Sequence, residues 1–133
     1  MNDRETVIVD GLRTPFGRMG GALAQLSAVK LATPLIKEIV ERNKIKPDSI
    51  DEVIVGQVVL AGCGQIPSRQ ALLAAGLPNT TESTTVNKVC ASGMRAVTLA
   101  DLRIRAKAFQ HSFLQHAQQL DLHGHGHALD FIE

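Results

Sequence analysis

The chain has little aromatic character. Trp and Tyr are absent, and aromatic residues make up 3% of its 133 residues. A core without large rings must be assembled from Val, Ile, Leu and Ala, which suits a parallel sheet covered by helices. An excess of charge is also missing, since the formal net charge is +1 and no Lys/Arg run is present. Nucleic acid is therefore not an expected partner.

Long apolar runs and cysteine pairs are missing as well. No segment reaches the ~18 consecutive apolar residues of a membrane span, and no signal-peptide stretch follows the polar N-terminus. These features predict a cytoplasmic, globular protein with no membrane partner. The two cysteines, Cys63 and Cys90, form no CxxC pair. Neither a zinc site nor a disulfide is expected.

Strand and helix patterns alternate along the first hundred residues. Their order predicts an α/β fold with about three parallel strands and right-handed crossovers. Pro34 either kinks the first helix or restarts it, and Gly56 marks either a bulge or a close backbone approach. The apolar helix that follows Cys90 is expected to be buried. The predicted strands are 6–10, 51–60 and 84–89. The predicted helices begin after the N-cap Ser27, at Ile66 and at about Ser92, and the last one runs to about Leu122.

The segment VNKVCASGM, residues 86–94, carries the strongest chemical signal. A predicted strand runs directly into a predicted helix, and Cys90 lies at the joint. The first turn of a helix has unpaired N–H groups and the positive end of the helix dipole, which stabilise a thiolate. The small neighbours Ala91, Ser92 and Gly93 leave room for a substrate carbonyl. Cys90 is therefore either a nucleophile or a small buried residue, the commoner role of a cysteine in an apolar run.

Three segments in a fixed order resemble the thiolase family, in particular acetyl-CoA acetyltransferases. They are VIVDGLRTPFGRMGGAL (7–23), IDEVIVGQVVLAGCGQIPSRQALLAAGLP (50–78) and VNKVCASGMRAVTLAD (86–101). The resemblance implies an incomplete thiolase N-terminal half-domain over residues 1–106. A ketoacyl synthase of the same superfamily is a weaker match to the same segments.

The resemblance implies an acyl-CoA acyltransferase in which Cys90 takes an acyl group as a thioester. A second acyl-CoA, deprotonated at its α-carbon, then attacks in a Claisen condensation, or the reverse thiolysis occurs. No cofactor is implied, because coenzyme A thioesters are substrates. The family's Gly-His-Pro, Cys-x-Gly and Asn-Glu-Ala-Phe motifs do not occur in this sequence. The chain alone is thus expected to have negligible turnover. The alternative is a non-catalytic fragment that pairs with full-length thiolase subunits.

The loop around residue 67 resembles a family segment near the subunit interface of a homo-oligomer. Gln65, Arg69 and Gln70 are therefore interface candidates, and the competing interpretation is a turn that positions the next helix. Arg13 is interpreted as a structural loop residue and Cys63 as incidental.

The composition changes after Ala106. All five histidines lie in the last 23 residues, and Lys107 stands where the family has a helix-ending glycine. Residues 107–133 are predicted to be a non-matching tail, helical and then flexible. Closely spaced imidazoles at His123, His125 and His127 suit a transition metal, but the favoured interpretation is a Gly-interrupted terminus without a metal.

Overall fold

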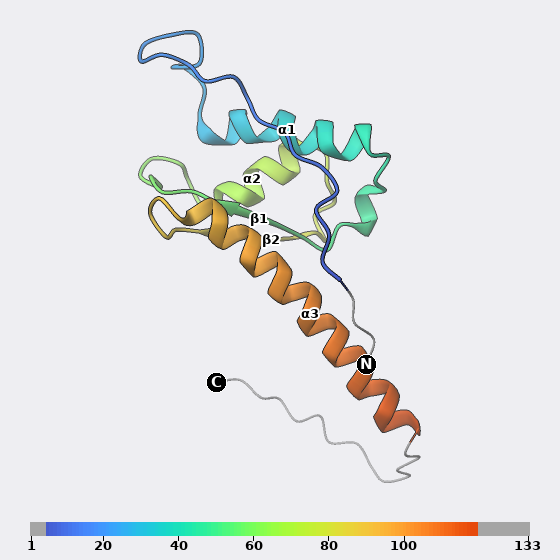
Figure 1. Ribbon diagram of the computed structural model, residues 1–133. Coiled ribbons are helices and arrows are strands. Elements are labelled where there is room, and N and C mark those ends of the chain that lie inside the picture. The colour runs from blue at the N-terminus through green and yellow to red at the C-terminus, as the bar shows by residue number, and fades with distance from the viewer. Residues whose placement is uncertain (1–4, 120–133) are drawn as a thin grey trace.

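The computed structural model describes residues 5–119, with side chains through residue 106. A two-stranded parallel sheet forms the middle layer, with two helices over one face and one long helix against the other (Figure 1). Strands β1 (Glu52–Gly56) and β2 (Glu82–Val86) pair in register from Glu52 opposite Glu82 to Gly56 opposite Val86. Among residues 5–119, no helix has the length and apolarity that crossing a bilayer requires.

Helix α1 (Ala28–Arg42) begins where the sequence predicts. The hydroxyl of Ser27 accepts a hydrogen bond from the Lys30 N–H at 3.2 Å and caps the first turn. Pro34 lies inside one continuous helix, so a restart at this position is excluded. The turn before it is held by the Thr33 hydroxyl, which donates to the Val29 carbonyl at 2.8 Å.

Helix α2 (Pro67–Ala74) follows β1 and supplies most of the small core. Its first helical residue is a proline, which needs no N–H partner there. Ser68 lies fully buried and accepts a hydrogen bond from the Thr85 hydroxyl of β2 at 2.8 Å. This bond fixes the helix on the sheet. The buried apolar residues of the described chain are Pro67, Ala71, Leu72, Leu77 and Ala96.

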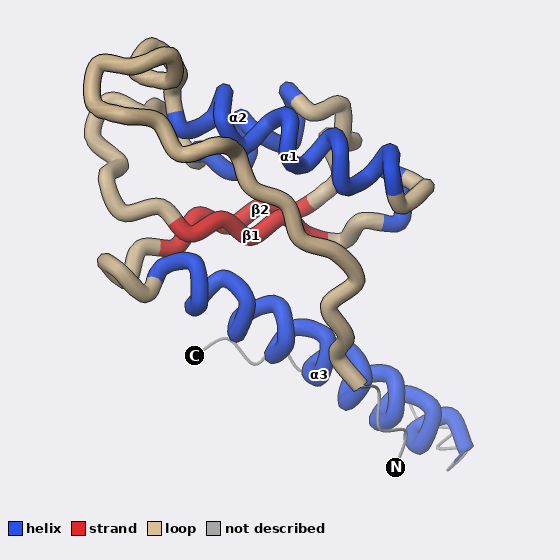
Figure 2. Tube along the Cα trace, turned by 45° about the horizontal axis from the view of Figure 1, so that its top comes forward, coloured by secondary structure: helices blue, strands red, loops and turns tan. Residues whose placement is uncertain are grey.

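The predicted first strand, 6–10, is wrong: the segment is extended but pairs with no strand in the described chain. Val7, Ile8 and Val9 are 68%, 85% and 75% exposed. The segment crosses from α3 to α1 (Figure 2) and is held at its end by Asp10, which hydrogen-bonds Arg42. Apolar β-branched residues form a strand only where they can pair with the edge of a sheet and pack one face against other residues. Two strands, not three, therefore form the described sheet.

The two remaining strands are also shorter or shifted relative to the prediction. β1 stops at Gly56 rather than residue 60, and β2 covers 82–86 rather than 84–89. The side chain of Gln57 donates to the Val59 carbonyl at 2.9 Å, and that of Asn87 accepts from the Val89 N–H at 2.9 Å. Local hydrogen bonds from a side chain to the nearby backbone compete with the hydrogen bonds between strands, and the strand ends there.

Helix α3 (Ser92–Gln119) has the predicted start and continues past residue 106 without a break. The predicted end near residue 122, the flexible part of the tail and its three spaced histidines fall outside the described residues. The prediction of a buried helix is wrong for its first turns. Ser92 and Ala96 are buried, whereas Met94 and Val97 are 69% and 55% exposed. Two strands cover only one side of the helix, so the apolar residues on its other side face outward.

Candidate functional site

Cys90 lies in the short connection between β2 and α3. β2 ends at Val86 and α3 begins at Ser92, so the strand leads to the helix through a connection of five residues rather than directly. The carboxyl ends of both parallel strands and the first turn of α3 lie at the same end of the molecule (Figure 1). Side chains at this end can therefore act on one substrate.

The thiol of Cys90 is free and exposed. Gly93, three residues later, has nothing within 4 Å of the position that a β-carbon would take. The interpretation of Cys90 as a small buried residue is therefore wrong.

The turn before Cys90 has unusual backbone geometry. Val89 has a φ of 48°, in the left-handed region that a β-branched residue rarely enters. The Ser92 hydroxyl donates to the Val89 carbonyl at 2.7 Å and accepts from the Lys88 N–H at 2.8 Å. The Asn87 amide donates to the carbonyl of Val58, in the loop after β1, at 2.8 Å.

Gly56 brings the end of β1 into direct backbone contact with α3. A β-carbon at position 56 would lie 2.3 Å from the Ser92 carbonyl carbon and 2.5 Å from the Gly93 nitrogen. No side chain other than hydrogen fits there. Of the two alternatives for this glycine, the close backbone approach is confirmed.

The loop before α2 uses its polar side chains inside the chain. The Arg69 guanidinium donates to the carbonyls of Thr81 and Asn79 at 2.7 and 2.6 Å. The Gln70 amide donates to the carbonyls of Cys63 and Gln65 at 2.8 and 2.9 Å. These bonds support the positioning role for Arg69 and Gln70, and an interface role for the three candidates stays a prediction.

Arg13 and Cys63, two further residues from the sequence analysis, each make a side-chain contact within their own loop. Arg13 stacks its guanidinium over the Phe16 ring, 5.3 Å from the centroid, in an exposed loop. Cys63 is half-buried, and its sulfur accepts from the Gln57 amide at 3.1 Å. Within the described residues, no group of three or more His, Cys, Asp or Glu side chains could hold a metal.

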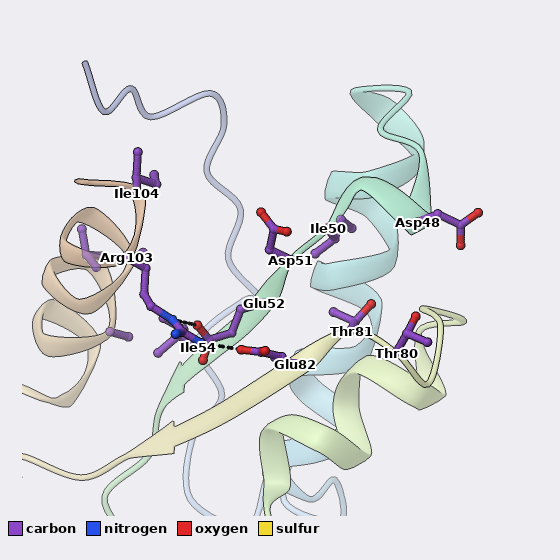
Figure 3. A pocket seen from close by; sticks show the side chains of 13 residues that line it. Asp48, Ile50, Asp51, Glu52, Ile54, Thr80, Thr81, Glu82, Arg103 and Ile104 are labelled. Carbon is purple, nitrogen blue, oxygen red and sulfur yellow. Dashed lines mark hydrogen bonds and ion pairs between the residues drawn. The ribbon is translucent and has the colours of Figure 1, made fainter. Parts of the chain in front are cut away.

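A groove of about 710 Å³ lies between the sheet and α3 (Figure 3). Arg103 of α3 donates to Glu52 of β1 at 2.8 Å and also pairs with Glu82 of β2. Its hydrogen bond to Glu52, with the nearby charges of both carboxylates, raises the pKa of the guanidinium. The groove is lined by Asp48, Ile50, Asp51, Glu52, Ile54, Thr80, Thr81, Glu82, Ala96, Val97, Ala100, Arg103 and Ile104.

Sequence reasoning did not find the roles of Asn87, Ser92 and Arg103. Asn and Ser beside a strand-to-helix joint are residue types that bond local backbone, and this signal could have singled out the first two. Arg103 gave no local signal, because its partners lie 51 and 21 residues earlier in the chain.

Comparison with known proteins decides the family. The thiolase N-terminal domain matches residues 6–114 of this chain. The chain belongs to the thiolase family. It is 53% identical over 94 residues to the acetyl-CoA acetyltransferase of Thiocystis violacea, covering 71% of this chain and 24% of that protein. It is 52% identical over 99 residues to the acetyl-CoA acetyltransferase of Schizosaccharomyces pombe, covering 74% and 25% respectively.

A solved thiolase has a similar fold. The crystal structure of the Acat5 thiolase from Ascaris suum in complex with coenzyme A superposes with a TM-score of 0.62 at 37% identity. The superposition covers 65% of this chain and 22% of that one. The chain thus spans about a quarter of the length of the thiolases it matches. The domain boundary at residue 106 stays a prediction.

Proposed function

We propose that this chain carries the nucleophile of an acyl-CoA acyltransferase of the acetyl-CoA C-acetyltransferase type, and that Cys90 is that nucleophile. The observation that carries the proposal is an exposed thiol at the N-terminal end of a long helix, beside an unobstructed Gly93. The names of the related proteins support acetyl-CoA as substrate, and the coenzyme A complex of the Ascaris suum thiolase supports binding of a coenzyme A thioester.

In the proposed first step, the Cys90 thiolate attacks the carbonyl carbon of acetyl-CoA. A bond forms between the Cys90 sulfur and that carbon, and the bond from the carbon to the coenzyme A sulfur breaks. Coenzyme A leaves as a thiolate and takes a proton from water. The attacking sulfur belongs to a residue two positions before the first residue of α3.

In the proposed second step, the α-carbon of another acetyl-CoA attacks the Cys90 thioester and releases acetoacetyl-CoA. A base must first remove the α-proton, and this sequence holds none of the family motifs that supply it. We therefore expect acylation of Cys90 without sustained turnover by the 133-residue chain alone.

Mass spectrometry after incubation with acetyl-CoA tests the proposal. In parallel, a small acetyl thioester of N-acetylcysteamine tests acylation without the nucleotide part of coenzyme A. We expect one acetyl group on Cys90, removed by neutral hydroxylamine because thioesters are labile to it whereas acetyl-lysine is not.

The matched variants are Cys90→Ser and Cys63→Ser, each of which removes one of the two thiols. Acetylation should disappear in Cys90→Ser and persist in Cys63→Ser. Equal labelling of the two variants, or labelling that resists hydroxylamine, would contradict the assignment of Cys90.

A further inference from the structure

We propose that Asn87 and Ser92 are positioning residues, which hold the left-handed turn at Val89 and thereby fix the Cys90 thiol at the start of α3. The inference rests on the proposed role of Cys90 as nucleophile. Neither side chain needs to touch a substrate, because both bind the backbone of Lys88 and Val89, directly before the thiol.

The positive φ of Val89 must be maintained by interactions with the surrounding residues. A left-handed β-branched residue is strained and persists only where its surroundings impose the conformation. The Val89 side chain is largely exposed, so packing around it does not maintain this conformation. The hydrogen bonds to its backbone do.

Ser92 binds the turn from the helix side. Its side chain is 3% exposed, and its hydroxyl both donates to the Val89 carbonyl and accepts from the Lys88 N–H. One hydroxyl therefore binds two backbone groups before Cys90, the Lys88 N–H and the Val89 carbonyl. Alanine at this position leaves both groups without that partner.

Asn87 binds the turn from the strand side. Its carbonyl oxygen accepts from the Val89 N–H, and its amide donates to Val58 in the loop after β1. In addition, Gly56 and Ser92 are in close backbone contact, so the first turn of α3 packs directly against the end of β1. One end of the turn is thus tied to the loop after β1 and the other to the end of β1 itself.

The position of the thiol depends on this arrangement. The stabilisation that a helix start gives to a negative charge falls off within one turn, and misplacement of a reacting group by about 1 Å can cost two orders of magnitude in rate. If Val89 relaxes to a negative φ, the chain direction at Cys90 changes and the thiol moves relative to the start of α3.

The test uses the full chain with Ser92→Ala and Asn87→Ala. The first readout is the NMR cross-peak between the N–H and Hα of Val89, which is strong when φ is positive. The second is the rate of alkylation of Cys90 by iodoacetamide, divided by that of Cys63 in the same molecule. Cys63 is half-buried and reports loss of the fold.

The matched control is Ser68→Ala, which also removes a fully buried hydroxyl with a hydrogen bond, but on α2. We expect both turn variants to weaken the Val89 cross-peak and to lower the Cys90-to-Cys63 ratio about tenfold. Ser68→Ala should change neither. An unchanged cross-peak and ratio in both turn variants, or the same change in Ser68→Ala, would overturn the inference.

These readouts are independent of acetylation. A wild-type chain that takes no acetyl group but shows the expected alkylation pattern would refute the proposed function and leave the positioning role intact. An acetylated Cys90 with unaffected turn variants would do the reverse.

Discussion

At the residue scale, Gly56 and Gly93 have opposite surroundings although both lie beside the Cys90 turn. A β-carbon at position 56 meets the backbone of Ser92, whereas a β-carbon at position 93 meets nothing. Neither glycine has a positive φ. The two sites therefore differ in the room available for a β-carbon, and substitution by alanine measures this difference directly.

We expect Gly56→Ala to lower the free energy of unfolding by about 1–3 kcal/mol or more, because backbone must shift to admit the methyl group. Gly93→Ala should be neutral or stabilising by up to about 1 kcal/mol, since alanine is the better helix former. Urea unfolding followed by circular dichroism measures both. Equal effects of the two substitutions would refute the close approach.

Sequence reasoning at this scale succeeded where one residue carries its own signal. Cys90 at a strand-to-helix joint and Gly56 within an apolar strand were both singled out. The partnership of Asn87 with Val58 was not, because the bond spans 29 residues and no local pattern encodes it. The left-handed Val89 also contradicts its own propensity, so propensity could not predict it.

At the element scale, Arg103 joins α3 to both strands. Its partners, Glu52 and Glu82, stand opposite each other in the parallel register, so one guanidinium reaches two neighbouring strands. The Glu52 side chain is mostly buried, whereas the Arg103 side chain is about half exposed. Arg105 on the same helix pairs with Asp101, one turn earlier.

We expect Arg103→Gln to lower the free energy of unfolding by about 1 kcal/mol, because the partly buried Glu52 carboxylate loses the positive charge that pairs with it. Arg105→Gln should cost no more than about 0.5 kcal/mol, as exposed pairs within one helix do. Urea unfolding in low salt gives both values. A larger loss for Arg105→Gln than for Arg103→Gln would show that the bridge between α3 and the sheet contributes nothing.

The elements themselves were predictable to different degrees. Helices α1, α2 and α3 begin within one residue of their predicted starts, because Ser27, Pro67 and the Cys90 joint mark them. The strand predicted at 6–10 has the right composition, but whether it pairs depends on an edge elsewhere in the chain. In the described structure Asp10 instead ties it to the end of α1. The bonds from Arg42, then Asn43 and the Gly11 N–H, hold the pKa of Asp10 well below its usual value of 3.8.

At the scale of the whole molecule, most large apolar side chains of the described chain are not buried. Few apolar residues of the described chain are buried, while the N-terminal segment and the outer side of α3 expose theirs. Exposed apolar surface of this kind favours association in water. On α3 the exposed apolar residues include Met94 and Leu102, together with Val97 and Ile104, which line the groove beside the sheet.

We expect the purified chain to self-associate with rising concentration, and Met94→Lys to weaken that association. Met19→Lys introduces the same charge at a methionine that is fully exposed in the loop before α1, and it is the matched control. Sedimentation velocity at several concentrations measures the effect. A concentration-independent monomer with a sharp thermal transition would contradict the expectation, as would equal effects of the two lysines.

The turn at Val89 has a consequence that concerns handedness. A φ of 48° is strained for an L-residue, but it is an ordinary value for its mirror image. A chain assembled chemically with D-valine at position 89 would keep the same side-chain atoms and lose the conformational cost. Such a chain would hold the Cys90 turn even without the hydroxyl of Ser92, because the stereochemistry of one α-carbon would replace two hydrogen bonds.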